Sequence, residues 1–543
     1  MTSFTSTSLP KEGRTDNRYK QGSLTKHDTQ PNPRKTDNAI AGQSVEVAVF
    51  DSELLRNRST FQVAFMSFVL ASIPYGLATS LFYPLINGGT STMIWGWLVV
   101  SLIVLCVAVS LAEITSVYPT AGGVYYQTFM LSSVRWRKLA AWICGWCYVL
   151  GNILITLAVQ FGTTLFIVGC INVFESSPGV GIFPADTYQV YLIFVALTIF
   201  CNAVSSLGNK WLPLLDTFAI VWTFAGLLAI IVCTLVLAKG GRHSASYVFG
   251  GFEALSGWPK GWAFCVGLLH AAYATSSTGM ILSMCEEVKF PATQVPKAIV
   301  GTIILNTIAG LLFLISLAFI LPDLTKLIAA AQPTPIIIKS AVGSSGIAFA
   351  LLMPLMVLAI ICGIGCTTAA SRCTWAFSRD GAIPGSQCWR KINRSTQTPL
   401  NAMMLSMIIQ IVVGAIYFGS VTAFNSFSSA GVIFLTLSYA TPITMSLLGG
   451  RKHVKRGAFY LGGIGAFCNV VAICWSALAI PLFCMPSYLP VTAGTANYAS
   501  VVFVGSVTVA IVWYWVWGYK NYQGPTVIGT EHQHHSGVED EEN

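Results

Sequence analysis

Long apolar blocks separated by short polar segments constrain this chain more than any other feature. Each block is long enough to cross the hydrocarbon core of a bilayer as a helix, which takes about 20 residues. The blocks cover roughly residues 61–85, 94–112, 139–170, 188–206, 212–238, 259–284, 298–321, 346–370, 401–418, 422–448, 459–484 and 498–518. Lipid accepts only helices and closed barrels, and continuous apolar runs favour helices over the alternating strands of a barrel. We therefore expect an all-α polytopic membrane protein with twelve transmembrane helices.

The balance of charged residues excludes other broad classes of protein. Only 9% of the 543 residues are charged, whereas water-soluble domains carry about 25%. The net charge is +9, but the basic residues form no continuous face, so we expect a lipid bilayer and no nucleic acid as partner. The cysteines lie mostly inside apolar blocks, without the paired spacing of a zinc site. We therefore predict structural thiols, no metal site and no cofactor.

Polar segments flank the apolar region at both ends of the chain. Residues 1–58 are rich in Ser, Thr, Asn, Lys and Asp, and residues 521–543 finish in an acidic run. Such compositions are typical of disordered tails. We predict a disordered N-terminal tail over 1–58, a twelve-helix membrane domain over 59–520 and a disordered acidic C-terminal tail over 521–543.

The loops between the blocks carry Lys and Arg on one side of the expected membrane. With the N-terminus inside, the inner loops hold fifteen basic residues, concentrated in 372–394 and 451–456, and the outer loops hold five. Short cytoplasmic loops are enriched in Lys and Arg, so we predict that both termini are cytoplasmic. Arg372, Arg379 and Asp380 either form a network that closes the inner side of the protein or anchor a loop at anionic headgroups.

Two of the blocks contain segments that interrupt a regular helix. In the first block, Ser72–Gly76 combines a proline, which removes a helical hydrogen bond, with a glycine that relaxes the backbone. In the sixth block, Tyr273–Gly279 places four hydroxyl side chains in a row. Taken alone, each segment is compatible with an ordinary kink. Blocks one and six are, however, the pair that a five-plus-five inverted repeat relates, and such paired breaks form the binding site of many secondary transporters.

The pairing of the two breaks predicts a cradle for a small-molecule ligand. Backbone amides freed at the start of a half-helix favour a carboxylate, and freed carbonyls favour an ammonium group or a sodium ion. The rings of Tyr75 and Tyr273 either face an organic cation or simply pack within the bundle. The predicted substrate-binding residues are Ser72, Ile73, Pro74, Tyr75, Gly76, Tyr273, Ala274, Thr275, Ser276 and Ser277.

The middles of the blocks lack charged residues, which leaves the coupling ion open. Intramembrane proton relays usually contain a carboxylate or a histidine, and the only such residue is His270, about one turn before the second break. As a lone histidine it is also compatible with a hydrogen-bonded packing role. Thr367 and Thr368 in the eighth block either hold a cation against the first block or pack. The sequence therefore leaves two alternatives for the coupling ion, H+ and Na+.

Several stretches outside the two breaks carry distinctive motifs. They are 110–126 (SLAEITSVYPTAGGVYY), 286–299 (EEVKFPATQVPKAI), 371–384 (SRCTWAFSRDGAIP), 399–402 (PLNA) and 490–498 (PVTAGTANY). Jointly they resemble the amino acid–polyamine–organocation permeases, specifically the fungal amino-acid/choline permeases, over about residues 60–520. The resemblance implies a LeuT-like fold, which is a five-plus-five inverted repeat with helices 1 and 6 broken, followed by helices 11 and 12.

The same resemblance implies a function. The expected activity is secondary active transport of amino acids, choline or related small amines by alternating access, with the plasma membrane as the expected location. Many relatives have an acidic residue, a histidine and a tryptophan near the second break, where this chain has Gly279, Ser283 and Tyr273. That departure leaves a specialised amine metabolite, imported or exported, as an alternative substrate. A nutrient sensor that binds without transport is a further alternative, whereas no nucleophile–base pair supports an enzyme.

Overall fold

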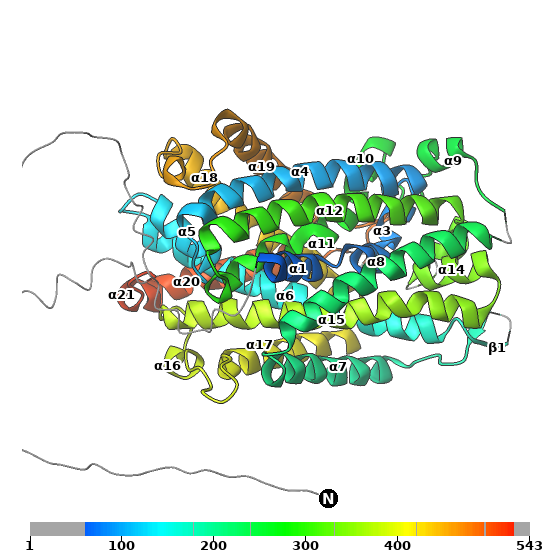
Figure 1. Cartoon of the computed structure of the whole chain (residues 1–543), viewed down its shortest axis with the longest axis horizontal. Coiled ribbons are helices and arrows are strands. Elements are labelled where there is room, and N and C mark those ends of the chain that lie inside the picture. The colour runs from blue at the N-terminus through cyan, green and yellow to red at the C-terminus, as the bar shows by residue number, and fades with distance from the viewer. Residues whose placement is uncertain are drawn as a thin grey trace, which may run out of the picture. The chain divides into compact units, whose positions relative to one another are not determined.

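The computed structural model of the chain, drawn in Figure 1, describes residues 60–525 apart from 178, 239–240, 329, 331, 420 and 493–495. Side chains are described over the same range, except at residues 60–63, 65 and 421–425. The N-terminal tail predicted over 1–58 lies outside the described residues, as does the C-terminal tail beyond residue 525. The described residues belong to one compact unit and are mostly helical.

The membrane-spanning helices coincide with the predicted blocks. Span one is divided into α1 (Thr60–Ala71), α2 (Ile73–Ser80) and α3 (Phe82–Ile86), and span six into α10 (Lys260–Gly267), α11 (Leu269–Thr275) and the 3₁₀ helix η1 (Ser276–Glu287). The spans that consist of one helix are α4 (Gly89–Val117), α6 (Arg137–Ile171), α7 (Thr187–Leu207), α8 (Leu212–Val236), α12 (Pro291–Phe319), α15 (Ser345–Arg379), α18 (Val421–Leu448) and α19 (Gly462–Leu482). The other two are α17 (Leu400–Gly414) with η2 (Ala415–Phe418), and α20 (Ala499–Trp513) with η4 (Tyr514–Gly518) and α21 (Tyr519–Asn521). Among the described residues, eleven helical segments are long and apolar enough to cross a membrane, and the apolar stretch Met66–Ser80 supplies the first span. The all-α polytopic fold is therefore confirmed.

Short elements connect the spans. They are α5 (Gly123–Leu131), the antiparallel pair β1 (Glu175–Ser177) and β2 (Val180–Gly181), α9 (Ala245–Gly250), α13 (Leu324–Ile328), α14 (Pro333–Val342), α16 (Ser386–Trp389) and η3 (Val454–Arg456). Figure 1 shows α5, α16 and α21 at one end of the bundle and α9, α14 and β1 at the other. We call the first the basic end, because the Lys- and Arg-rich loops after α5 and α16 lie there.

Local sequence signals set where several spans begin. Asp186 precedes α7 and forms a reciprocal capping box with Gln189, which satisfies amides that the first helical turn leaves free. Helices α8 and α12 begin with Pro213 and Pro291 in their first turn, where the missing N–H is not needed.

Burial separates the interior spans from the peripheral ones. The apolar window of span six is 89% buried, whereas that of α20 is 17% buried, so α20 lies at the periphery of the bundle. In Figure 1, α1 and α11 lie in the middle of the bundle with α4, α12 and α15 running past them. The two interrupted spans are thus surrounded by the uninterrupted ones.

Small residues let the interior helices approach closely. Such residues are common between transmembrane helices, because in lipid the hydrophobic effect does not drive the helices together. A Cβ on Gly310 of α12 would lie 2.7 Å from the Trp97 ring of α4, and a Cβ on Gly145 of α6 would overlap the Phe377 ring of α15. These contacts fix the spacing of the helices that enclose spans one and six.

Candidate functional site at the two helix breaks

Span one is broken at Ser72, as the sequence predicts. Ser72 adopts a left-handed conformation with φ 39° and ψ 48° between α1 and α2. This conformation costs a non-glycine residue about 1–2 kcal/mol. Its hydroxyl donates to the Val69 carbonyl, and its own carbonyl accepts the Gly76 amide at 3.0 Å. Pro74 supplies no N–H, so the start of α2 offers the amides of Ile73 and Tyr75 as its free donors.

Span six changes helix type where the sequence predicts its break. The α-helix α11 ends at Thr275, and the chain continues as a twelve-residue 3₁₀ helix. Runs of this kind rarely exceed 3–4 residues. The hydroxyls of Ser276 and Thr278 each donate at 2.7 Å to the carbonyls of Tyr273 and Thr275, three residues earlier. These short-range bonds compete with the α-helical ladder, which gives a physical reason for the transition.

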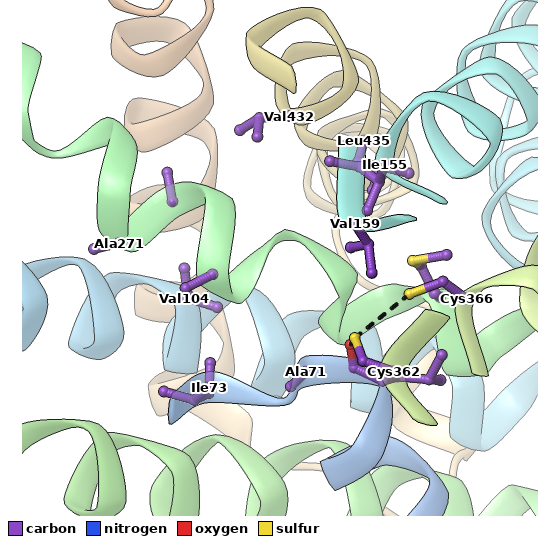
Figure 2. Packing of buried hydrophobic residues seen from close by; sticks show 14 of the residues in the cluster. Ala71, Ile73, Val104, Ile155, Val159, Ala271, Cys362, Cys366, Val432 and Leu435 are labelled. Atoms are coloured by element: carbon purple, nitrogen blue, oxygen red, sulfur yellow. Dashed lines mark hydrogen bonds between the residues drawn. The ribbon is translucent and has the colours of Figure 1, made fainter. Parts of the chain in front are cut away.

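The two breaks meet inside the bundle. A Cβ placed on Gly76 would lie 3.4 Å from both the Cα and the Cβ of Ala274, so α2 and α11 are in backbone contact there. Figure 2 shows Ala71 and Ile73 flanking the break in span one, with Cys362 and Cys366 of α15 on one side and Ala271 of α11 on another. The structure therefore brings the segments 72–76 and 273–277 together.

The predicted aromatic residues occupy different surroundings. Tyr75 is buried, and its hydroxyl contacts the Val159 carbonyl at 2.9 Å and the Thr163 hydroxyl at 2.8 Å, both on α6. Its ring meets Phe166 edge-on. Tyr273 is only half-buried, in contrast to its neighbours Ala272 and Ala274. Tyr75 thus fixes span one to α6, and Tyr273 is the tyrosine that keeps exposed surface.

Two tyrosines that sequence analysis missed hold the 3₁₀ stretch. Tyr439 of α18 donates to the Ser276 carbonyl at 3.1 Å, and Tyr148 of α6 donates to the Gly279 carbonyl at 3.1 Å. A Cβ on Gly279 would lie 2.5 Å from the Tyr439 ring, so only glycine fits. These two carbonyls are therefore already bonded within the protein.

A cavity lies beside the break in span six. It is small, partly open and mostly apolar. Its lining comes from four spans: Val104, Val107, Ala108 and Leu111 of α4; Ala272, Thr275, Ser276, Thr278 and Gly279 of span six; Leu435, Thr436 and Tyr439 of α18; and Trp475 and Ser476 of α19. Of the predicted cradle, Thr275 and Ser276 line this cavity, whereas Ser72–Gly76, Tyr273, Ala274 and Ser277 do not.

Helix α15 presents thiols, not hydroxyls, to span one. The Cys362 thiol donates to the Leu70 carbonyl at 3.7 Å, and Figure 2 shows its contact with Cys366, sulfur to sulfur, at 4.0 Å. Thr367 and Thr368 lie on other faces of α15: Gln160 of α6 donates to Thr367 at 2.8 Å, and Ser205 of α7 contacts Thr368 at 2.7 Å. The structure thus places both threonines against α6 and α7.

Ion pairs close the basic end beneath span six. Arg372 is fully buried and pairs with Glu287 at 2.8 Å, while Arg379 pairs with Glu286 at 3.3 Å. Glu286 also accepts the backbone amide of Ala121, in the loop before α5, at 3.2 Å. Because Arg372 has no exposed surface, it does not anchor a loop at lipid headgroups. The geometry fits the other alternative, in which Arg372 and Arg379 belong to a network that closes this side of the protein.

The remaining chemistry of the site is sparse. No group of three His, Cys, Asp or Glu side chains lies close enough to hold a metal ion within residues 60–525 as described.

Paired broken helices in a bundle of twelve spans define a secondary transporter of the inverted-repeat class.

The chain belongs to the amino acid permease family, whose model matches residues 59–507. The resemblance inferred from the sequence motifs is therefore confirmed, and the protein is a multi-pass membrane transporter, not an enzyme.

Relatives align along most of the chain. An uncharacterised amino-acid permease of Schizosaccharomyces pombe is 32% identical, covering 87% of both chains. A choline transporter of Saccharomyces cerevisiae is 29% identical, covering 86% of this chain and 82% of its own. An amino-acid permease of Oryza sativa, a BAT1 homologue, is 31% identical, covering 88% and 94% respectively.

Proposed function

We propose that this protein moves an amino acid, choline or a related small amine across a membrane by alternating access, driven by an ion gradient. The observation that supports this most is the contact between Gly76 and Ala274, which joins the two broken helices in the middle of the bundle. Substrate names borne by the relatives, amino acid and choline, point to the same class.

The cradle comprises Ser72, Ile73, Pro74, Tyr75 and Gly76 of span one with Tyr273, Ala274, Thr275, Ser276 and Ser277 of span six. The free amides at the start of α2 suit a carboxylate or hydroxyl oxygen, and the carbonyl end of α1 suits an amine. Tyr273, which is half-buried, supplies an aromatic ring to the cradle, and Tyr75 holds the break in position. Thr275 and Ser276 of the cradle also line the cavity on the other side of span six.

A proton fits the coupling role better than a sodium ion. A hard cation needs several oxygen ligands, yet α15 turns the Cys362 thiol toward the end of α1 and the Thr367 and Thr368 hydroxyls toward α6 and α7. The thiols of α15 are soft ligands that suit sodium poorly. We therefore assign H+ as the coupling ion.

We place the basic end in the cytoplasm and the protein in the plasma membrane. The excess of Lys and Arg in the loops of that end supports this orientation, which puts both termini inside. The pairs Arg372–Glu287 and Arg379–Glu286 then close the cytoplasmic side.

Flux in proteoliposomes tests the proposed function. Purified protein is reconstituted and offered radiolabelled choline, γ-aminobutyrate and a mixture of amino acids, each with a matched unlabelled internal pool. Saturable exchange of one of them is the expected result. Binding in a thermal-shift assay without any exchange would instead identify a sensor, and neither binding nor exchange of any of them would contradict the proposed function.

A further inference from the structure

His270 connects the two half-helices that the breaks create. It lies in α11, is 1% exposed, and its Nδ1 lies 3.0 Å from the hydroxyl of Ser80 on α2. Both residues are on the side of the breaks away from the basic end. The side chain therefore spans a contact that must change if α2 and α11 move apart.

The hydrogen bonds assign the tautomer. The hydroxyl of Ser80 donates its single proton to the Gly76 carbonyl at 2.7 Å. It can therefore only accept from His270, which puts the ring proton on Nδ1. The other nitrogen, Nε2, then carries a free lone pair, and it is buried with no hydrogen-bond partner among the described residues.

The surroundings of His270 contain no counter-charge. The elements that pack against α11 are α2, α3, α4, α10, α18 and η1. Helices α2, α3 and α18 carry no Asp, Glu, Lys or Arg. The charged groups on the others are Lys260, which is exposed at the start of α10, and Glu113, Glu286 and Glu287, each paired with an arginine. Their neutral titratable groups are Tyr75, Tyr83, Cys106, Cys265, Cys285 and Tyr439.

This arrangement ties protonation to conformation. A buried imidazolium without a counter-charge costs several kcal/mol, whereas the same cation in contact with water does not. Closed packing of α2 on α11 therefore favours the neutral ring, and separation of the two helices opens Nε2 to water and protons. A group whose charge depends on which side is open is what gradient coupling requires.

We propose that His270 is the proton-binding residue of this transporter. The proton adds to the lone pair of Nε2 when α2 and α11 separate and the hydrogen bond from Nδ1–H to Ser80 breaks, while Nδ1 keeps its own proton. When the helices close and the basic end opens, the Nε2–H bond breaks and the proton leaves to water on that opposite side. This inference rests on the proposed function and names the residue that carries its coupling ion.

The test measures protons and substrate in the same vesicles. Wild-type protein is reconstituted with a trapped pH-sensitive dye, and flux of choline, γ-aminobutyrate or the amino-acid mixture is started with no other ion gradient. We expect proton movement together with net substrate movement. Homoexchange, which needs no net proton transfer, serves as the parallel assay.

The informative variant is His270→Asn. The asparagine amide places a donor where Nδ1–H lies, so the bond to Ser80 is retained and only the titrating nitrogen is lost. We expect substrate-linked proton flux to fall about tenfold or more, with homoexchange little changed. Ser80→Ala, which removes the hydroxyl but keeps His270, should retain proton flux.

The possible failures are distinguishable. Absence of exchange in the wild type would contradict the proposed function itself. Net substrate flux in the wild type without proton movement would contradict the role of His270 and the choice of H+ but not transport itself, and this measurement needs no variant. Proton flux that persists in His270→Asn would also overturn the assignment.

Discussion

Gly76 of α2 lies directly against Ala274 of α11, with 3.4 Å between the Cβ that Gly76 lacks and the nearest atoms of Ala274. At this distance one added carbon makes ordinary contact, whereas a branched side chain has no space. Gly76→Ala should therefore keep transport within about twofold, and Gly76→Leu should lower it about tenfold or more by forcing the half-helices apart. Uptake normalised to the amount of protein in the vesicles measures both. Normal transport by Gly76→Leu would show that this contact is not part of the cradle.

The two tyrosines that bond the 3₁₀ stretch should contribute to stability. Tyr148→Phe and Tyr439→Phe each remove the side-chain donor to a carbonyl of the 3₁₀ stretch, that of Gly279, which is buried, or of Ser276, which is part-buried. We expect each change to cost about 1–3 kcal/mol in the free energy of unfolding. Thermal unfolding in detergent compares them with Tyr519→Phe, whose side chain is exposed. A control that loses as much as the two variants would argue against the role of these bonds.

Sequence patterns predicted the spans and the breaks because both depend on local chemistry. Apolar length alone determines that a segment crosses lipid, and Pro74 with Gly76 weakens one helix whatever surrounds it. The hydrogen bonds that Tyr148 and Tyr439 donate to carbonyls of span six were not predictable in this way. Each bond joins residues more than 100 positions apart, and a tyrosine in an apolar block looks the same whether it packs or donates.

Helix phase explains why the residues of α15 at span one were not identified. Thr367 follows Cys366 directly, so the two side chains point about 100° apart around the helix. We considered Thr367 and Thr368 as cation ligands because they carry hydroxyl oxygens. Their positions around the helix direct them toward Gln160 and Ser205, whereas Cys362 and Cys366 face the break in span one. One residue of register decides which chemistry the site has.

The pair Arg372–Glu287 should be costly to break and tolerant of joint replacement. Arg372→Met leaves a nearly buried carboxylate without this counter-charge, which costs about 3–5 kcal/mol. Arg372→Met combined with Glu287→Leu removes both charges and should recover most of that loss. Thermal unfolding of the single and double variants gives the interaction energy. Removal of the pair Lys339–Glu175, in which Glu175 is exposed and Lys339 half-buried, is the control and should change less, because solvent screens it in part. A loss in the double variant equal to the sum of the losses of Arg372→Met and Glu287→Leu would mean that the pair is not coupled.

The thiols at span one should report on opening of the cradle. Cys362 and Cys366 are buried, so a small thiol reagent reaches them only when the helices separate. We expect inhibition of transport by such a reagent to require turnover and to disappear in the double variant Cys362→Ala/Cys366→Ala. Cys388 is exposed, and Cys388→Ala should leave inhibition unchanged. Uptake after timed exposure to the reagent measures this, and inhibition that persists in the double variant would place the reactive thiol elsewhere.

The segment after α21 should be sensitive to a single methyl group. Tyr522 is fully buried against the Trp142 ring at 5.1 Å between centroids, and Gly524 follows with φ +94° so close to Phe129 that a Cβ would overlap its ring. Gly524→Ala therefore adds a clash to the backbone strain, and we expect it to lower the free energy of unfolding by about 2–4 kcal/mol. Gly450 has a similar backbone, with φ +66° and open space around it, so Gly450→Ala carries the strain of about 1–2 kcal/mol alone. Thermal unfolding of the two variants in detergent separates the cost of the steric clash from the cost of the backbone strain. Equal shifts in the two variants would show that the segment moves away from Phe129 at little cost and does not hold the basic end together.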